Sequence, residues 1–404
     1  MEMSELTALL TPEGLALLDA TGAVVTSEDA LRAVSRLRAA GHGPELVSAV
    51  VTQARLRTRA TAKFGPFAER MLFTRAGLEQ ATRMPVAARH AGRFRAAGIT
   101  SVADLGCGIG GDALAFAGAD LRVLAVDADE VTAAITAYNL AIFGDDVRVR
   151  HARAEETDLS DVYAAWLDPA RRTAGHSETT RVAADEYAPS LPWVYALAER
   201  MPVGVKLGPA HDRAEIPAEA EAQWVSDGGS VVELALWFGA LARPGIRRAA
   251  LVMRGDETHE LTAAADTEDE PVRTLGAFLH EPDGAVIRAR LIGEVARSLD
   301  AGMLSAGIAY VTGDAAVTSP FVQSFRVREE LPTDVKQLAR ALKARGIGTL
   351  EIKKRGVDVD PAILRRKLKL TGGESATLVL TRRGNSRVAI LADRVDPAAP
   401  ARRD

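Results

Sequence analysis

Cysteines, metal-ligand patterns and long apolar runs are scarce in this sequence. The chain has one cysteine in 404 residues, Cys107, which excludes an intrachain disulfide framework and favours a reducing cytoplasm. Its seven histidines show no metal-ligand spacing, so no metal site is expected. We interpret Cys107, which lies between two glycines, as a small filler residue.

Membrane-spanning and targeting segments are also missing. No stretch approaches the roughly 18 apolar residues of a membrane span, and the start, Met-Glu-Met-Ser-Glu, lacks the basic and apolar regions of a signal peptide. Hydrophobic residues make up 47% of the chain, which is ordinary for a globular protein. The composition therefore predicts a cytoplasmic protein of two or three domains with no membrane partner.

The charge is unevenly distributed along the chain. Residues 326–390 contain 16 Lys and Arg against 7 Asp and Glu, a net charge of +9, whereas the whole chain has a net charge of −4 and the remainder therefore −13. A basic segment on an otherwise acidic protein is typical of a surface that binds a polyanion. A solvated basic face without a partner is the alternative.

Residues 1–85 are predicted to form an N-terminal helical domain. A capping Ser27, acids in the next turn and apolar residues at helical spacing indicate one helix, and residues 44–60 repeat the pattern. The next stretch, residues 63–82, combines aromatic, basic and amide side chains. Two interpretations stay open for it: a lid over a ligand pocket, or an apolar face that joins two domains.

The motif with the clearest chemistry is Val-Ala-Asp-Leu-Gly-Cys-Gly-Ile-Gly-Gly-Asp, residues 102–112. An apolar strand runs into glycines at positions 106, 108 and 110, and a short helix follows near Gly111. Glycines allow the backbone to turn tightly and to approach a ligand closely, and the free amides at the start of a helix face such a ligand. The pattern predicts the cofactor loop of a βαβ unit.

Asp104 indicates which cofactor this loop binds. A carboxylate two residues before the first glycine would repel a pyrophosphate, which disfavours a nicotinamide-dependent oxidoreductase. The same carboxylate suits a ligand with a cationic amino acid group and no phosphate, such as S-adenosylmethionine. The alternative interpretation is that Asp104 only caps the following turn.

Three further strand ends follow at spacings that suit an open α/β sheet. Val123–Asp127 is a second strand, and Asp127 is placed to bind both hydroxyls of a ribose. Glu155 follows a third strand and is a candidate acceptor for the adenine amino group. Asp168 and Pro169 follow a fourth strand, at the sheet edge where ligands bind.

The next segments complete the predicted sheet. Residues 202–209 form a fifth strand with Lys206 near its end. Residues 222–226 and 231–238, separated by Asp-Gly-Gly, are typical of a terminal antiparallel hairpin, where a dehydrogenase would have another parallel crossover. His90, in the helix before the first strand, is interpreted as an exposed residue without a catalytic role.

Residues 86–270 therefore resemble the class I S-adenosylmethionine-dependent methyltransferases. The resemblance implies an α/β, Rossmann-like sheet with an antiparallel terminal hairpin, S-adenosylmethionine as cofactor, and methyl transfer as activity. The cofactor-binding residues that it implies are Asp104, Leu105, Gly106, Cys107, Gly108, Gly110, Asp127, Ala128, Glu155 and Asp168. It assigns catalysis to the sequence that begins with Asp168-Pro169 and includes Arg171.

The catalytic motif departs from the usual pattern of base methylation. Asp168 is the candidate proton acceptor for an attacking amine, provided that it lies within about 3 Å of it. Enzymes that methylate base amines commonly have a second proline and an aromatic residue where this chain has Ala170 and Arg171. Arg171 and Arg172 would instead bind a phosphate or stack on a base. A loose resemblance to the trimethylguanosine synthase group hints at guanine, and the target atom stays open.

Residues 325–392 resemble the THUMP-like domain found C-terminal to methyltransferases, THUMP being an RNA-binding module of tRNA-modifying enzymes. Strands alternate here with basic helices, after a connecting segment, residues 271–324, in which residues 281–299 are predicted to form one helix. Residues 255–270 are predicted to form an acidic loop. The resemblance implies RNA, for example tRNA or rRNA, as a partner. The implied RNA-binding residues are Lys353, Lys354, Arg355, Arg365, Arg366 and Lys367.

The leading hypothesis is an RNA methyltransferase that binds structured RNA on its basic C-terminal domain and presents a nucleotide to Asp168. One alternative is a methyltransferase of a small molecule or a protein. Another is a catalytically weak protein that binds the cofactor and RNA. The sequence leaves the oligomeric state open.

Overall fold

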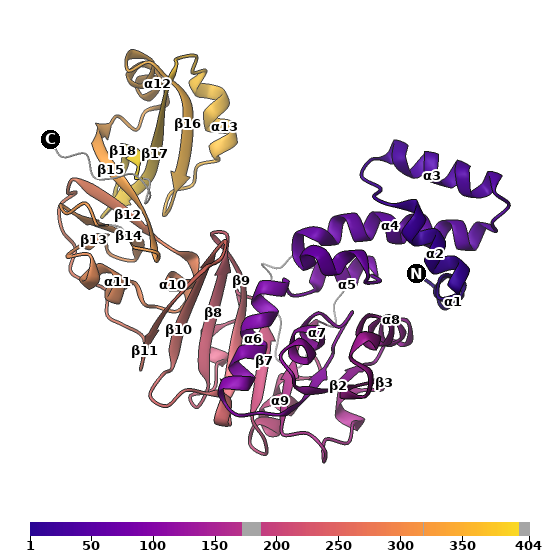
Figure 1. The fold of residues 1–404 in the computed structure, drawn as a ribbon. Helices are drawn as coiled ribbons and strands as arrows, with labels where there is room; N and C mark the ends of the chain where they lie inside the picture. The colour runs from indigo at the N-terminus through magenta and orange to yellow at the C-terminus, as the bar shows by residue number, and fades with distance from the viewer. Residues whose placement is uncertain (172–186, 318, 396–404) are drawn as a thin grey trace. The chain divides into compact units, whose positions relative to one another are not determined.

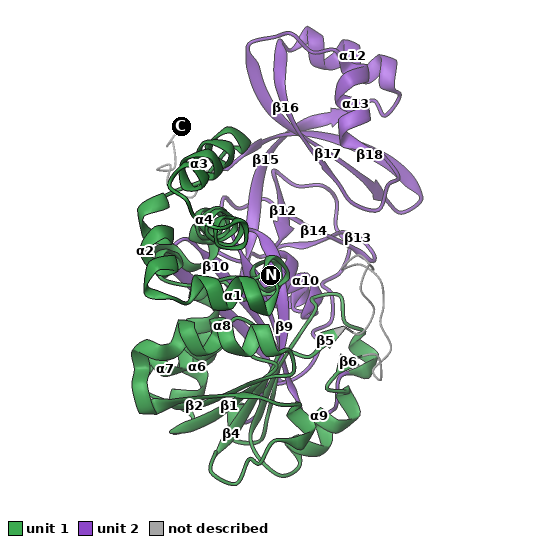
Figure 2. Ribbon diagram, turned by 90° about the vertical axis from the view of Figure 1, so that its right-hand side faces the viewer, with its two compact units in different colours: residues 1–215, 236–243 green, residues 216–235, 244–404 purple. Residues whose placement is uncertain are grey.

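The computed structural model describes residues 1–171, 187–317 and 319–395, and Figure 1 labels its helices and strands. It divides into two compact units, which Figure 2 shows in different colours. One unit comprises residues 1–215 and 236–243, and the other comprises residues 216–235 and 244–404. The chain passes from the second unit back into the first within a single strand, β9 (Ser230–Phe238). In the described part of the chain, no helix has the length and apolar character needed to cross a membrane.

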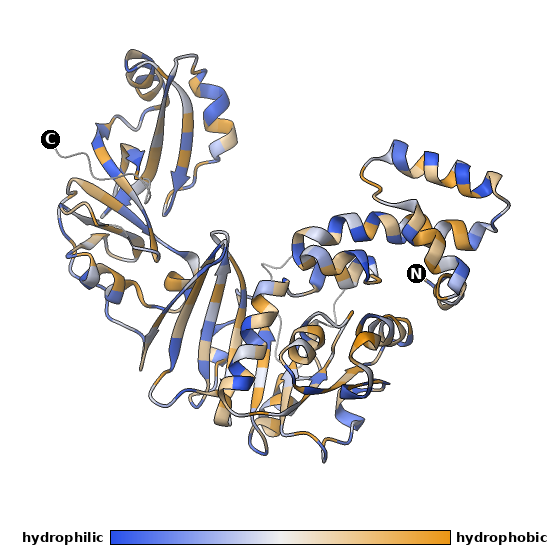
Figure 3. Cartoon of the chain, viewed as in Figure 1, coloured by the Kyte–Doolittle hydropathy of each residue, from blue (hydrophilic) through white to orange (hydrophobic). Residues whose placement is uncertain are grey.

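The first unit begins with helices that pack on one long helix, α4 (Pro44–Phe64). The helices that contact α4 are α1 (Met3–Leu9), α2 (Pro12–Thr21) and α3 (Ser27–Ala39). Apolar side chains at helical spacing, such as Val47, Val50 and Ala54, are buried along α4 and stabilise this bundle. Figure 3 colours the apolar positions of the chain orange. The predicted N-terminal helices are therefore present.

Three short helices connect this bundle to a parallel sheet. They are η1 (Gly65–Glu69), α5 (Arg75–Gln80) and α6 (Met84–Ala96). The sheet has five parallel strands in this unit, in the order β7-β4-β1-β2-β3. The strands are β1 (Ser101–Leu105), β2 (Arg122–Asp127), β3 (Val147–His151), β4 (Ala164–Leu167) and β7 (Val203–Leu207).

The strand order changes direction at β1, which lies between β4 and β2. The helices that link the strands include α7 (Gly111–Gly118), α8 (Glu130–Leu140) and α9 (Leu191–Ala198). Ligands of open α/β sheets bind beyond the carboxyl ends of the strands at such a switch point. The predicted α/β fold with a large parallel sheet is confirmed.

A cluster of aromatic side chains forms the core beneath this edge. The rings of Trp166 and Trp237 lie 5.5 Å apart, and Phe94 packs edge-on against both. Gly204 in β7 makes this packing possible, because a Cβ at that position would lie 2.7 Å from Trp166 and 2.8 Å from Trp237. The carboxyl ends of β4 and β7 are therefore anchored by a densely packed core.

The second unit begins with the predicted hairpin. β8 (Glu221–Asp227) is joined to β9 by Gly228 and Gly229, whose φ angles of +58° and +82° suit a two-residue hairpin turn. β10 (Arg248–Arg254) pairs with β8 in parallel, and β11 (Glu257–Ala263) pairs with β10 antiparallel. Residues 255–270 were predicted to form a loop, but part of this stretch forms β11. The prediction is wrong there because backbone pairing with β10 stabilises a strand whose side chains are polar and half-buried.

The rest of the second unit is a seven-stranded sheet in the order β13-β14-β12-β15-β18-β17-β16. The strands are β12 (Phe278–Pro282), β13 (Gly302–Ser305), β14 (Ile308–Gly313), β15 (Val322–Leu331), β16 (Ile347–Lys354), β17 (Glu374–Arg383) and β18 (Ser386–Arg394). Residues 271–324, predicted as a connecting segment, contribute β12, β13 and β14 to this sheet. Only the β16–β17 pair is parallel among the strand pairs described here.

Residues 281–299, predicted as one helix, contain the end of β12 and two short helices. These are α10 (Gly284–Arg288) and α11 (Ile292–Ser298). Arg290, between them, has a φ angle of +58°, which a continuous helix does not allow. The single-helix prediction is therefore wrong. It failed because the helical spacing of apolar residues continues across the break and hides it.

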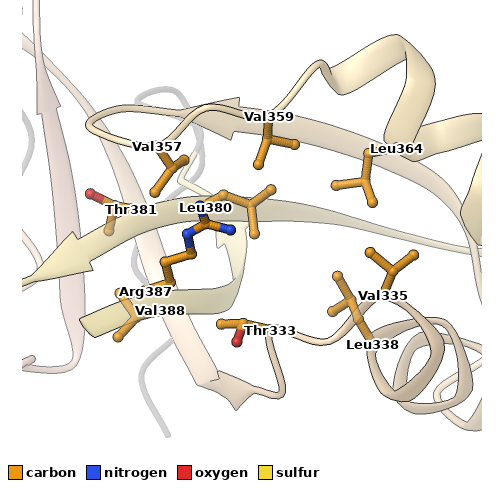
Figure 4. Close-up of a pocket in the computed structure, with 10 residues that line it drawn as sticks. All are labelled: Thr333, Val335, Leu338, Val357, Val359, Leu364, Leu380, Thr381, Arg387 and Val388. Atoms are coloured by element: carbon orange, nitrogen blue, oxygen red, sulfur yellow. The ribbon is translucent and has the colours of Figure 1, made fainter. Parts of the chain in front are cut away.

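Two amphipathic helices, α12 (Val335–Ala344) and α13 (Pro361–Leu368), contact each other and β16. Between them and strands β17 and β18 lies a cavity of about 110 Å³, lined mainly by aliphatic side chains (Figure 4). Leu338, Leu364 and Leu380 in its walls also belong to the buried core of this fold. Val335 and Arg387, which also line it, are exposed, so the hollow lies at the edge of that core and is partly open to solvent.

Candidate active site

The loop after β1 depends on three glycines in the left-handed region. Gly106, Gly108 and Gly110 have φ angles of +85°, +56° and +83°, which other residues adopt at a cost. A Cβ at Gly106 would lie 3.3 Å from the backbone oxygen of Asp168, and one at Gly110 would lie 3.0 Å from Thr136. The loop therefore passes close to the end of β4, as a cofactor loop at a strand switch point does.

Asp104 is buried beside this loop. Its side chain is 1% exposed, and its Oδ2 atom has no hydrogen-bond partner among the described residues. Burial, together with the negative charges of nearby carboxylates, raises the pKa of Asp104 well above its usual range. The carboxylates concerned are Asp112, Asp168 and Asp127. A buried acid with an open oxygen is suited to a cationic ligand, because that ligand would stabilise its ionised form.

Asp127 ends β2, as predicted. Its two carboxylate oxygens accept hydrogen bonds from the backbone amides of Gly108 and Asp129, both at 2.9 Å. Burial raises its pKa, although these two amides act in the opposite direction. Each oxygen retains capacity for a second hydrogen bond, so the predicted ribose contact is compatible with this geometry. The next residue, Ala128, is exposed, and its carbonyl oxygen lies 3.1 Å from Nε2 of His151.

Glu155 follows β3 in the short helix η3 (Ala154–Glu156). Its carboxylate lies 3.5 Å from Nη2 of Arg153 and is about one quarter exposed. Since that contact joins two neighbours on the surface, it neither favours nor opposes adenine binding. The predicted role of Glu155 stays a prediction.

Residues 64–82 pack on the glycine loop. The amide of Asn139 donates hydrogen bonds to the carbonyl oxygens of Leu72 (3.0 Å) and Ile109 (2.9 Å), which connects this segment to the loop. A Cβ at Gly77 would collide with Ile109. Phe64, Phe73 and Leu78 are buried, whereas Phe67 is exposed. The segment therefore has a mainly buried apolar face, as the domain-joining interpretation expects, and a contact with the glycine loop, as the lid interpretation requires.

Asp168 is paired with Lys206, a residue for which the sequence indicated a position near a strand end but no role. Nζ of Lys206 donates to Oδ2 of Asp168 at 2.5 Å. Leu167 in β4 lies opposite Val205 in β7. Asp168 and Lys206 are the residues that follow these two, so they lie side by side. Knowing that β4 and β7 are neighbours would have been enough to predict this pair.

His90 is buried, which corrects the prediction of an exposed residue. It is 2% exposed, its Nδ1 lies 2.8 Å from Oδ1 of Asp112, and its ring lies 4.2 Å from that of Trp166. The reason is its position on the face of α6 that also buries Val86 and Phe94. Helical spacing with these apolar residues was the signal for its burial.

Asp112 is held ionised by its partners. The Thr82 hydroxyl donates to Oδ2 of Asp112 at 2.8 Å. Burial opposes ionisation, but the bond and charge of His90, the charge of Lys206 and the Thr82 bond together lower the pKa of Asp112. Asp104 and Asp112 therefore differ in what surrounds them: both oxygens of Asp112 have hydrogen-bond partners, whereas Asp104 is bonded to the backbone amide of Ala113 and its Oδ2 has no partner among the described residues.

The other predicted site residues are Leu105, Cys107, Pro169 and Arg171, and the structure describes the side chains of the first three. Leu105 and Pro169 are buried. Cys107 is 7% exposed, and burial with the charges of Asp104 and Asp127 raises its thiol pKa well above the ordinary value, as suits a filler residue. The backbone of Arg171 pairs with Tyr187 in a two-stranded ribbon, β5 (Ala170–Arg171) and β6 (Tyr187–Ala188). The side chain of Arg171 and all of Arg172 lie outside the described residues.

The residues at this edge fit S-adenosylmethionine. The observation that supports the fit is the buried Oδ2 of Asp104, which has no hydrogen-bond partner within the described ranges and suits the cationic amino acid part of that cofactor. No group of three or more His, Cys, Asp or Glu among residues 1–171, 187–317 and 319–395 could hold a metal ion.

The predicted RNA-binding residues fall into two sets. Lys353 and Arg355 are paired with Glu281, with nitrogen–oxygen distances of 2.9 and 3.5 Å. Lys354, Arg366 and Lys367 are exposed and have no ion pair with a described residue. Arg365 is exposed and donates to the carbonyl oxygen of Leu350 at 3.2 Å. The exposed set lies mainly on α13, so the structure leaves these charges accessible to a polyanion.

Comparisons with known proteins concern the family of the chain and its domains. Residues 322–394 match a family described as THUMP domain-like, and residues 2–60 match a domain of unknown function, DUF8688. Two curated proteins of Mycobacterium tuberculosis, from strains CDC 1551 and H37Rv, are each 34% identical over 357 residues, which are 86% of this chain and 95% of theirs. Both are named uncharacterised S-adenosylmethionine-dependent methyltransferases.

A solved structure shares the fold. The crystal structure of a candidate methyltransferase from Porphyromonas gingivalis W83 has a TM-score of 0.70 and 19% identity, and the match covers 92% of this chain and 100% of that one. At this identity the similarity concerns architecture alone. It extends over both units of the chain.

Proposed function

Because this chain belongs to the S-adenosylmethionine-dependent methyltransferases, we propose that it methylates a nucleotide base of structured RNA that its THUMP-like domain binds. The enzyme class and the cofactor follow from the relatives. The substrate is our proposal, and it is supported by the charge and the exposure of one surface in the second unit.

That surface, the basic face of α12 and α13, carries the proposal. On α12, Lys336, Arg340 and Lys343 are spaced i, i+4 and i+7, so they share one side of the helix, and all three are exposed. Leu338 and Leu342, on the other side, are buried. Lys354, Arg366 and Lys367 are further exposed cations of the same unit, and exposed cations suit phosphate groups.

The residues at the parallel sheet suggest how the chain would promote methyl transfer. S-adenosylmethionine supplies an electrophilic methyl group when it is bound. Asp104 would hold its cationic part, and the backbone of the glycine loop allows close approach. Asp168 would accept a hydrogen bond or a proton from the attacking amine. Positioning of the amine would supply much of the rate.

Comparing nucleosides from two strains tests the substrate. RNA from a strain that lacks this protein is digested and compared by mass spectrometry with RNA from the parent strain. We expect one methylated nucleoside to be missing, and to return with the wild-type chain but not with Asp168→Ala. Identical nucleosides in both strains would contradict the proposal.

A binding experiment with the purified protein tests the RNA surface separately. We expect retention of a tRNA mixture that weakens steeply as salt increases, because phosphate contacts release counterions. Cofactor binding without any retention of RNA would favour the alternative, a small-molecule or protein substrate. Retention of RNA without any methylated product would favour a binding protein with weak catalysis.

A further inference from the structure

A chain of polar side chains leads from Asp168 into the core of the first unit. Lys206 donates to Asp168 at 2.5 Å, to the Thr82 hydroxyl at 3.1 Å and to the Gln80 carbonyl oxygen at 3.4 Å. Thr82 then donates to Asp112 at 2.8 Å, and Asp112 lies 2.8 Å from Nδ1 of His90. Five side chains from β7, the end of β4, α6, α7 and the α5–α6 connection thus form one network.

The chemistry of these groups determines the direction of the hydrogen bonds. An ammonium group only donates, and a hydroxyl has one proton to give. Since Thr82 donates that proton to Asp112, its oxygen is left to accept from Lys206. The Asp168 carboxylate, the Thr82 hydroxyl and the Gln80 carbonyl oxygen all accept from Nζ, so the head of Lys206 has a defined orientation.

The far end of the network is rigid. Asp112 and His90 are 7% and 2% exposed, and the centroid of the His90 ring lies 4.2 Å from that of Trp166 and 6.0 Å from that of Trp237. These rings belong to the core that contains Gly204. Thr82 is also buried, so the ammonium of Lys206 is attached to a fixed support rather than to a surface side chain.

The charges around Asp168 make its partner important. Asp104 and Asp112 are acidic neighbours in the same region, and both Asp112 and Asp168 contribute to the negative potential at Asp104. Lys206 is a cation that contacts Asp168 and also acts on Asp112, and His90 is the titratable group beyond it. An ammonium held against Asp168 stabilises its ionised carboxylate against these like charges.

We propose that Lys206 is the positioning residue of the catalytic edge, and that Thr82, anchored by Asp112 and His90, holds its ammonium where it keeps the Asp168 carboxylate ionised and oriented. The proposal rests on the proposed role of Asp168 in methyl transfer. It does not depend on which molecule receives the methyl group.

Carboxyl NMR of protein labelled with ¹³C-aspartate tests this without a substrate. Asp168→Asn assigns the Asp168 signal, and its titration is compared between the wild type and variants. We expect Lys206→Met to move the titration to higher pH by about 1–3 units, and Thr82→Val to move it in the same direction by less. Thr82→Ser keeps both hydrogen bonds and should match the wild type. Unchanged titrations in Lys206→Met and Thr82→Val would overturn the proposal.

Two further measurements distinguish a positioning role from a purely structural one. Binding of S-adenosylhomocysteine, measured by calorimetry, checks that each variant is folded. If Lys206→Met does not fold, the proposal is tested by comparing the Asp168 titration of Thr82→Val with that of Thr82→Ser. With RNA from the strain that lacks the protein, the acid limb of methyl transfer should shift to higher pH in Thr82→Val. A purely structural role would lower the rate without moving this limb. If the wild type methylates no RNA but the titrations shift, the proposed function fails and the positioning role stands.

Discussion

The acidic edge of the parallel sheet buries two of its carboxyl groups, whereas the basic face of α12 and α13 exposes its charged groups to water. Asp104 and Asp112 are 1% and 7% exposed, whereas Lys336, Arg340 and Lys343 are open to water. A buried charge interacts strongly and with few partners, and an exposed one interacts weakly and with many. The first region is therefore suited to one small cation, and the second to a large polyanion.

Replacing Asp104 should have the largest effect on this contrast. Asp104→Asn removes the buried negative charge at almost constant volume. We expect the binding free energy of S-adenosylmethionine to weaken by about 2–5 kcal/mol, as for the loss of one partner of a buried charge pair. Isothermal calorimetry measures this change. Asp146→Asn, at an exposed position, is the matched control, and equal affinities of the two variants would contradict the role of burial.

Gly204→Ala tests whether the acidic edge depends on the packed core below it. The new methyl group would collide with Trp166 and Trp237, and such overpacking typically costs about 1–3 kcal/mol of unfolding free energy. Denaturant unfolding measures the loss. Gly92→Ala is the control, because a Cβ there has no neighbour within 4 Å and alanine favours a helix. A Gly204→Ala variant as stable as the control would refute this dependence.

The pH dependence of cofactor binding should distinguish the buried carboxylate from an exposed one. The raised pKa of Asp104 means that its carboxyl group is protonated below that pKa, and a cationic ligand favours the ionised form. Affinity for S-adenosylmethionine should therefore fall by about tenfold for each pH unit below that pKa. Calorimetry over a pH series measures this slope, and Asp104→Asn should remove it.

The same group has the opposite effect on the stability of the ligand-free protein. A carboxyl group whose folded pKa is raised stabilises the fold while it is protonated, and this contribution is lost as pH rises through the folded pKa. Asp104→Asn should therefore raise the melting temperature at the higher pH values while it weakens the binding of the cofactor. A lower melting temperature throughout would show that the carboxylate has a structural partner.

Neutralising the basic face should produce the smallest and most graded effect. In Lys336→Gln/Arg340→Gln/Lys343→Gln, the salt dependence of tRNA retention should become shallower by about 0.7–0.9 in log–log slope for each phosphate that is no longer neutralised. Arg345→Gln is the control, because Arg345 on the same helix end is already paired with Glu329. A control that lowers the slope as much as the triple variant would contradict the assignment of this face.

The local patterns of the sequence predicted most of the elements that build the site. The glycine loop, the ends of β2 and β4, the fifth strand and the hairpin at Gly228 and Gly229 all follow from residues that are neighbours in the chain. The errors occurred where pairing or burial overrides such patterns. β11 is polar but held by β10, and the break at Arg290 lies inside a continuous helical pattern.

The site contacts were harder to predict because they join residues far apart in the chain. Lys206 and Asp168 are 38 residues apart, and His90 and Asp112 are 22 apart. Lys206 was expected only to lie near a strand end, and His90 to be exposed, because neither residue belongs to a motif. Similarly, no local pattern distinguished Lys353 and Arg355, which pair with Glu281, from the exposed Arg366 and Lys367.

The amino-acid sequence by itself determined the glycine loop, the acids at the strand ends and the basic character of the C-terminal third, because backbone conformation and charge are properties of adjacent residues. The tertiary structure decided which acid has a cation and which does not. That difference arises from strand order and from the packing of α6 on the sheet, which place Lys206 against Asp168 and His90 against Asp112 and leave one oxygen of Asp104 unpartnered among the described residues.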